Sequence, residues 1–208
     1  MTNESQQPDV NPKRDEKTID EDAQLMLRFR DGDESAFEQL VRRNVGHVHA
    51  LIYRFLRDPA VVDDVTQDVF LRIYRNAARY EPTAKFSTWL YRITANLCFN
   101  VTRSRKKGRP VSLDTVIEDE AVRRDVPDEA QPSPSAGLDA EELQREIARA
   151  IGELPEQQRA AILLNKYENR NYEDIAAVLE TTPAAVKSLL SRARANLRES
   201  LKRYVEEE

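Results

Sequence analysis

Arginine and asparagine side chains recur along one stretch of the chain at a spacing that could read nucleic acid. Residues 82–113 contain no Asp or Glu, although 33% of all residues are charged and the net charge is −5. A guanidinium can neutralise phosphate, and a carboxamide can both donate and accept hydrogen bonds at a base edge. The pattern indicates contact with a polyanion. The side chains concerned are Arg92, Asn96, Asn100 and Arg103.

The same stretch has the periodicity of an amphipathic helix. Ser87 can cap its first turn, and apolar residues at helical spacing assign one face to a core. A soluble helix with a solvated basic face would show this pattern too, as would a helix that binds a membrane or a protein. The apolar positions are Trp89, Leu90, Ile93, Leu97 and Val101.

A second cluster that could do chemistry is acidic. Asp63 and Asp64 adjoin each other, and Gln67 and Asp68 follow one helical turn later. Paired carboxylates can serve acid–base catalysis or a metal site, but no histidine or second carboxylate cluster accompanies them. We therefore expect a solvated face, or a docking surface for a basic protein, on a helix over 60–78. Its core stripe is predicted at Val61, Val65, Val69, Phe70 and Ile73.

A third candidate site lies near the C-terminus. Asn171 can cap a short helix, Glu180 and Thr181 can form a turn, and Thr182 followed by Pro183 can begin a second helix. This order predicts a helix-turn-helix over 171–194, whose second helix would enter a DNA major groove. A structural hairpin with a solvated basic face would look similar. The predicted exposed side carries Lys187, Ser188, Ser191, Arg192 and Arg194.

The elements that position these sites are predicted to be helices. Glycine is scarce, good helix formers are frequent, and no strand-like alternation of any length is present. We predict an all-α fold of two small helical domains joined by a flexible acidic linker that contains proline. The expected boundaries are a disordered lead-in over 1–19, a first domain over 20–109, the linker over 110–137 and a second domain over 138–208.

Composition excludes several classes of protein. The single cysteine, Cys98, rules out an internal disulfide and a multi-cysteine zinc site, and we expect it to fill space in the core. No window approaches the roughly twenty apolar residues of a membrane span, so we expect a cytoplasmic protein without membrane insertion. His47 and His49 are expected to be core or surface side chains. Since no nucleophile–base pair, metal cluster or phosphate loop is evident, no enzyme activity, metal or cofactor is predicted.

The order and spacing of these segments resemble those of a known family. Two runs carry the resemblance: DDVTQDVFLRIYRNAARYEPTAKFSTWLYRITANLCFNVTRSRKK, and after the linker LPEQQRAAILLNKYENRNYEDIAAVLETTPAAVKSLLSRARANL. They look like bacterial RNA polymerase sigma factors of the extracytoplasmic-function group, which have a region-2 and a region-4 domain. The resemblance covers nearly all of 20–201. It implies a transcription initiation factor that reads and helps to melt the −10 element and reads the −35 element.

The resemblance also assigns roles to matching residues. Asp64, Gln67 and Asp68 match the region-2 helix that docks on the clamp coiled coil of the largest polymerase subunit. The loop over 79–86 and the following helix match the part that captures a flipped −10 base, with Asn96 at the base-pocket position. The implied −10 contacts are Tyr80, Lys85, Arg92, Asn96, Asn100 and Arg103. The implied −35 contacts are Thr182, Ala184, Ala185, Lys187, Ser188, Ser191 and Arg192.

The implied partners are core RNA polymerase, through its clamp coiled coil and flap region, and promoter DNA, with an anti-sigma factor as a further candidate. Two positions depart from the family pattern. Leu189 stands where an arginine is common, which removes one usual DNA contact. Glu180 stands in the turn where glycine is frequent, which leaves the geometry of the turn open. Among the aromatic residues, Tyr80 and Tyr91 could stack on unpaired bases, whereas Phe86 and Trp89 favour the core.

Two other functions fit parts of the pattern. One is a stand-alone helix-turn-helix regulator that binds a palindromic operator as a dimer without polymerase. The other is a sigma-like adaptor that titrates an anti-sigma factor and no longer reads promoters; the basic stretch over 85–109 argues against it. Because the chain is acidic overall, any DNA contact must be local or be helped by a partner.

Overall fold

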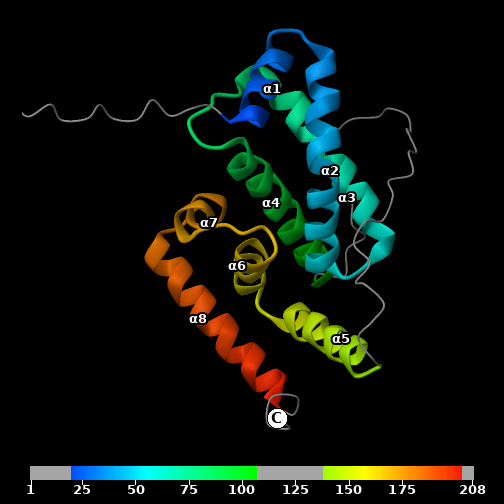
Figure 1. Cartoon of the computed structure of the whole chain (residues 1–208), viewed down its shortest axis with the longest axis vertical. Helices are drawn as coiled ribbons and strands as arrows, with labels where there is room; N and C mark the ends of the chain where they lie inside the picture. Colours follow the sequence, from blue (N-terminus) through cyan, green and yellow to red (C-terminus); the bar gives the residue numbers. More distant parts are fainter. Residues whose placement is uncertain (1–19, 107–137, 203–208) are drawn as a thin grey trace, which may run out of the picture.

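The structure, a computed structural model, describes residues 20–106 and 138–202 (Figure 1). The predicted lead-in over 1–19 and the linker over 110–137 lie outside these ranges. Within them every regular element is a helix, which confirms the all-α prediction. The elements are α1 (Glu21–Arg30), α2 (Glu34–Leu56), α3 (Pro59–Asn76), the short 3-10 helix η1 (Ala77–Arg79), α4 (Phe86–Lys106), α5 (Leu138–Glu153), α6 (Glu156–Lys166), α7 (Tyr172–Val178) and α8 (Pro183–Ser200).

Helices α1 to α4 form the N-terminal bundle. Apolar residues from all four helices are withdrawn from solvent in its core. The predicted stripe on α3 is confirmed at Val65, Val69, Phe70 and Ile73, but it begins at Val62, which is buried, whereas Val61 is half-buried. Large side chains that are fully buried in this bundle are Met26, Leu40, Val48, Ile52, Ile73, Phe86, Leu90 and Leu97.

The start of α4 is fixed by a residue far away in the sequence. Ser87 does not cap this helix, because α4 already begins at Phe86. The backbone N–H of Phe86 instead donates to the Asp20 carboxylate at 3.0 Å. The other carboxylate oxygen of Asp20 accepts from Ala23 N at 2.8 Å and caps α1. One side chain therefore satisfies the exposed N–H groups of two helices and ties their starts together.

Helices α6 to α8 form the C-terminal bundle, and the predicted caps of its helix-turn-helix are confirmed. The Asn171 side chain accepts from Asp174 N at 2.7 Å, and Thr182 accepts from Ala185 N at 3.2 Å. Pro183 occupies the first turn of α8, where its missing N–H costs nothing. The buried apolar residues that hold these helices together include Leu163, Leu164, Ile175, Val186 and Leu190.

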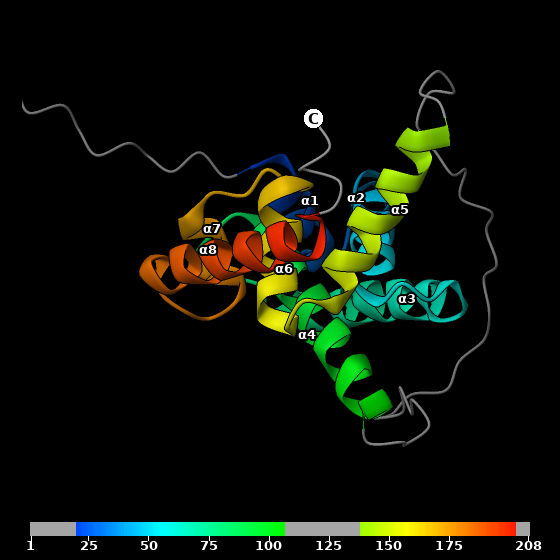
Figure 2. The ribbon, with the colours of Figure 1, turned by 90° about the horizontal axis from the view of Figure 1, so that it is seen from below.

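The two bundles pack directly against each other. Helix α7 contacts α4, α6 contacts α2, and α5 contacts both α2 and α8. Figures 1 and 2 show α3 on the side of the molecule away from α7 and α8. None of the helices in the described ranges combines the length and the apolar character that a bilayer crossing requires.

Cys98 lies in the core of the N-terminal bundle, as predicted, with 1% of its surface exposed. Burial raises the pKa of its thiol to about 12. Because the thiolate is the reactive form, only about one thiol in 10⁴ would be ionised at pH 8. We therefore expect the folded protein to resist a thiol reagent at pH 8 and to react once guanidinium unfolds it. A Ser200→Cys variant, with an added thiol at an exposed position, should react at once when folded; equally fast labelling of the wild-type chain would contradict the packing around Cys98.

Candidate nucleic-acid interface

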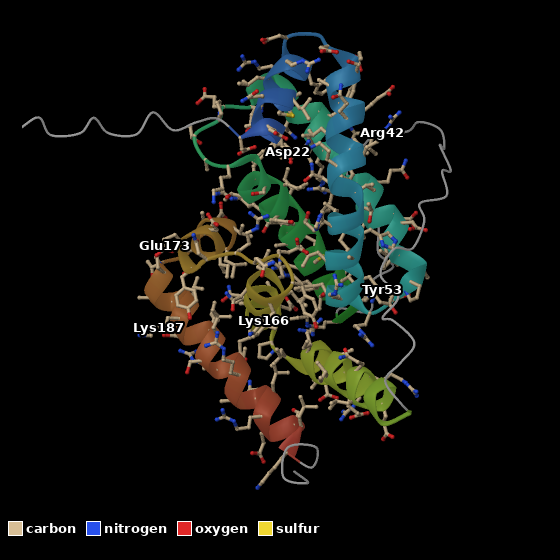
Figure 3. All side chains as sticks on the ribbon, viewed as in Figure 1. Asp22, Arg42, Tyr53, Lys166, Glu173 and Lys187 are labelled. Atoms are coloured by element: carbon tan, nitrogen blue, oxygen red, sulfur yellow. The ribbon has the colours of Figure 1, made fainter. Side chains whose placement is uncertain are left out.

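The outer side of α8 presents the predicted −35 contacts to solvent. Lys187, labelled in Figure 3, is exposed, as are Ser188 and Arg192. The Ser188 hydroxyl donates back to Ala184 O at 3.2 Å, which holds it against the helix. The remaining predicted side chains are in varied positions: Ala184 and Ser191 are exposed, Ala185 is half-buried, and Thr182 is exposed while capping the helix. Sequence reasoning missed Arg198, an exposed cation on α8.

The two departures from the family pattern have distinct structural outcomes. Leu189 is half-buried and packs against the core, so its side chain replaces a polar contact with apolar packing. Glu180 adopts a left-handed backbone conformation with φ of +52°. Such a conformation costs a residue with a side chain roughly 1–2 kcal/mol more than it costs glycine. The turn thus closes in the geometry that glycine would favour, with Thr181 N donating to Ala176 O at 2.9 Å.

Helix α4 presents only part of the predicted −10 set to solvent. Asn96, Asn100 and Arg103 are all exposed, and their spacing of four and three residues aligns them on one face. Arg92 is half-buried and donates from Nη2 to Ala177 O at 2.8 Å. Lys85 Nζ lies 3.5 Å from Asp174 Oδ2. The structure therefore places the two asparagines and Arg103 on one exposed face of α4, whereas Arg92 contacts α7 and Lys85, just before α4, is exposed with Asp174 nearby.

Tyr80 does not form a base-stacking surface in this structure, contrary to the prediction. Its side chain is only 5% exposed. The centre of its ring lies 5.1 Å from the ring centre of Trp89 and 6.1 Å from that of Phe86. Burial, followed by the nearby charges of Asp20 and Asp22, raises its pKa to about 12. The preceding helix η1 turns the chain so that this ring completes the core. Phe86 is fully buried, as expected, and Trp89 is half-buried.

The acidic residues of α3 separate onto two faces. Asp63 faces α2, where its carboxylate lies 3.1 Å from His49 Nε2. Asp64 and Gln67 are exposed, and Asp68 is half-buried. The adjacent carboxylates therefore do not converge, and no cluster of three or more His, Cys, Asp or Glu that could hold a metal ion is present among residues 20–106 and 138–202. Sequence reasoning missed two large apolar side chains exposed on the same helix, Leu71 and Tyr74.

A buried polar contact joins α4 to the loop before α7. The Tyr91 hydroxyl donates to Glu168 Oε2 at 2.6 Å, and Glu168 is only 8% exposed. Burial of the phenol, reinforced by the carboxylate, raises the Tyr91 pKa well above its usual value. His47 Nδ1 lies 3.5 Å from the same carboxylate oxygen, and Arg170 Nη1 donates to Ser87 Oγ at 3.0 Å. The sequence did not predict the burial of Glu168, because polar loops are usually exposed to solvent.

Comparisons with known proteins identify the family. Residues 40–108 match the model of sigma-70 region 2, and residues 144–197 match that of sigma-70 region 4. The RNA polymerase sigma-H factor of Pseudomonas aeruginosa is 33% identical over 191 residues, covering 91% of this chain and 98% of that protein. The ECF RNA polymerase sigma-E factor of Escherichia coli K12 is 33% identical over 173 residues, covering 83% of this chain and 90% of that protein.

Solved structures agree with this assignment. CnrH, in complex with the cytosolic domain of CnrY, superposes with a TM-score of 0.62 and 27% identity, over 88% of this chain and 98% of that one. The sigma factor RpoE of Bartonella quintana, in complex with the anti-sigma factor NepR, gives a TM-score of 0.60 and 25% identity, over 80% and 96% of the two chains. The chain belongs to the sigma-70 family of RNA polymerase sigma factors, in its extracytoplasmic-function group, and is a transcription initiation factor that directs RNA polymerase to promoters.

Proposed function

We propose that three exposed helix faces of this chain each have a separate role in transcription initiation. The acidic face of α3 holds core RNA polymerase, the exposed face of α4 reads the −10 element, and the outer side of α8 reads the −35 element. The observation that carries the proposal is that Asn96, Asn100 and Arg103 stand exposed in register on α4, one helix away from the exposed Asp64 and Gln67 on α3. The N-terminal domain over 20–109 and the C-terminal domain over 138–208 each then contribute one DNA reader.

The α3 face suits a basic protein partner. Asp64 and Gln67 are exposed on α3, which lies on the side of the molecule away from α7 and α8 (Figure 2), and the half-buried Asp68 adjoins them in the sequence. Carboxylate and amide groups on such a rim steer and orient a positively charged partner. The proposed partner surface is the clamp coiled coil of the largest polymerase subunit. The C-terminal domain is proposed to contact the polymerase flap region.

The α4 face suits single-stranded promoter DNA. Asn96 offers a donor and an acceptor to a base edge, and Arg103 offers charge to phosphate. Asn100, one turn from Asn96, extends the same face. Arg92 and Lys85 join this set once they leave the acceptors that hold them in the present conformation. Tyr80 is omitted from the proposed contacts because it is buried.

The α8 side suits the major groove. Residues near the start of a recognition helix reach base edges, which assigns Ala184, Lys187 and Ser188 to base contacts. Ser191 and Arg192, one turn later, are proposed to contact the backbone. Thr182 and Ala185 position the start of the helix, because the Thr182 hydroxyl accepts a hydrogen bond from the Ala185 backbone N–H.

Recruitment explains how an acidic chain can read promoters. Two modest DNA contacts gain affinity when polymerase fixes their spacing, because the second contact becomes effectively intramolecular. We expect the free chain to bind a promoter duplex poorly and the complex with core polymerase to bind it specifically. Fluorescence anisotropy at physiological salt measures both, and tight sequence-specific binding by the free chain would refute the recruitment mechanism.

An anti-sigma factor is proposed as a further partner. The similar sigma factor RpoE of Bartonella quintana was solved with the anti-sigma factor NepR bound, and CnrH with the cytosolic domain of CnrY. The stand-alone regulator is no longer needed as an alternative, because residues 40–108 match sigma-70 region 2. Transcription with core polymerase separates an active sigma factor from an adaptor that has lost promoter reading.

A further inference from the structure

A polar cavity of about 420 Å³ lies between α2, the start of α4 and the loop over 167–170. Its volume is in the range of small-molecule sites. Two carboxylates, of Asp22 and Glu168, and two guanidiniums, of Arg43 and Arg170, contribute to its lining. None of these four residues belongs to the helix faces proposed for polymerase and promoter, so the cavity has no part in the function proposed above.

The buried carboxylate of Glu168 has unused acceptor capacity. Its side chain is 4% exposed, and its Oε2 atom accepts from the Tyr91 hydroxyl and lies 3.5 Å from His47 Nδ1. Its Oε1 atom accepts no hydrogen bond from any residue that the structure describes. An ionised carboxylate has about four lone-pair sites, and a buried polar group without partners loses its hydration without compensation. Glu168 therefore offers free acceptor sites to a donor in the cavity.

The loop that carries Glu168 is held in place by hydrogen bonds. Asn165 Nδ2 donates to Arg170 O at 3.0 Å, and Arg170 Nη1 donates to Ser87 Oγ at 3.0 Å. The Arg170 guanidinium also lies 5.0 Å from the centre of the Tyr91 ring. The carboxylate and the guanidinium thus have set positions before any ligand binds, which lowers the ordering cost of binding.

The two guanidiniums keep free donors for an anion. Arg43 donates from Nε to Asp22 and from Nη2 to Glu21, each at 2.7 Å, and its side chain is 50% exposed. Arg170 donates from Nη1 to Ser87. Because a guanidinium has five N–H donors in a planar fork, both side chains can also bind phosphate oxygens.

Two rings in the lining present faces on which a base can stack. Tyr167 is 42% exposed, and the guanidinium of Arg54 lies 4.5 Å from the centre of its ring. The side chain of His47 is 68% exposed. Tyrosine, histidine and arginine are the side chains on which proteins commonly stack single bases.

We propose that this cavity binds a guanine nucleotide, either free or within a strand. Guanine carries two adjacent N–H donors, N1–H and N2–H, which fit the two oxygens of one carboxylate, here Glu168. Adenine places an acceptor where guanine has N1–H, and that acceptor would face the carboxylate. The phosphate then binds Arg43 and Arg170, and the base stacks on Tyr167 or His47. Such a ligand matches the charges, the rings and the free acceptor together.

The test measures nucleotide binding to the full chain. Fluorescence anisotropy follows a fluorescent GMP, and unlabelled GMP, AMP, CMP, UMP, guanosine and inorganic phosphate compete with it. GMP is expected to displace the probe at least about 10-fold better than AMP, since a mismatched donor leaves a buried acceptor unpaired. Absence of saturable binding at millimolar nucleotide would overturn the proposal, and so would equal displacement by AMP.

Glu168→Gln isolates the base contact. The amide keeps the shape of the side chain and an oxygen for the Tyr91 hydroxyl, but it presents N–H groups to the N–H donors of guanine. We expect GMP affinity to fall about 10- to 150-fold, the range for a hydrogen bond to a charged group, and the preference over AMP to disappear. The control is Glu173→Gln, which removes the same charge at an exposed position outside the cavity (Figure 3) and should bind GMP like the wild type. Retained guanine preference in Glu168→Gln, folded by circular dichroism, would overturn the proposal.

Arg43→Gln tests the phosphate contact at an exposed position, and so does not depend on whether Glu168→Gln folds. It should weaken GMP about 2- to 5-fold, as expected for an exposed charge pair, and leave guanosine unchanged. Arg42→Gln removes the adjacent arginine, which is exposed outside the cavity (Figure 3), and should change neither; an equal loss of GMP affinity in this control would contradict the assigned contact. The DNA trinucleotide TGT offers the same base edge within a strand. Displacement of the probe by GMP alone assigns the site to a free nucleotide, and equal displacement by TGT assigns it to a guanine in a strand.

Discussion

Asp64→Lys is expected to weaken binding to core RNA polymerase by at least about 30-fold. Asp64 is exposed on the outer face of α3, where no packing in the folded chain depends on it. Reversing its charge places an ammonium against a basic partner and leaves that partner's cation without its carboxylate. Loss of a desolvated charge pair at an interface costs about 2–5 kcal/mol. Competition between labelled wild-type chain and the variant for core polymerase measures the change.

The neighbouring residue provides a matched control for this prediction. Asp63→Lys makes the same charge reversal one position earlier, but Asp63 faces His49 on α2. The variant should keep core binding within a few-fold of the wild type, because the exposed His49–Asp63 pair contributes little to stability. If Asp63→Lys weakened core binding as much as Asp64→Lys, the polymerase contact would not be specific to the outer face of α3.

Asn96→Ala is expected to reduce open-complex formation by about 5- to 150-fold, which corresponds to the 1–3 kcal/mol of a good side-chain contact to a base. Asn96 is exposed on α4, and alanine is a better helix former, so the fold should not suffer. Permanganate reactivity of unpaired thymines measures strand opening, and a template with a preformed bubble should recover much of the loss if melting is the affected step.

Binding to core polymerase shows whether Asn96 contacts DNA or supports the fold. Asn96→Ala should bind core polymerase like the wild type, and Asn76→Ala, which removes an exposed asparagine at the end of α3, should leave strand opening unchanged. An equal loss of core binding in Asn96→Ala would show that the residue supports the polymerase contact or the fold, and does not read DNA.

Local hydrogen bonds made much of the fold predictable from the sequence. The caps at Asn171 and Thr182 each join a side chain to an amide three residues later, so the residue types alone indicate them. The helical stripe on α3 and the burial of Cys98 follow from apolar spacing and residue type in the same way. The exposed faces of α4 and α8 could be predicted in the same way, because each lies opposite the apolar stripe of its own helix.

Contacts between distant segments could not be predicted. Asp20 caps α4 across 66 positions of sequence, which is why Ser87 was wrongly expected to do so. Tyr80 is buried by the turn that η1 makes, although its loop suggests exposure. Glu168 is buried where it accepts from Tyr91 on the other bundle. Each of these three contacts depends on how two elements pack, which residue spacing within one element cannot predict.

Transcription in vitro from a pool of random promoters tests the central claim most directly. We predict that core polymerase with this chain yields transcripts from a subset of templates that shares two short motifs at a fixed separation, one for α4 and one for α8. Core polymerase alone should yield no such enrichment. Absence of enriched transcripts, with the same core polymerase active alongside another sigma factor, would contradict the assignment of the −10 and −35 elements to these two helices.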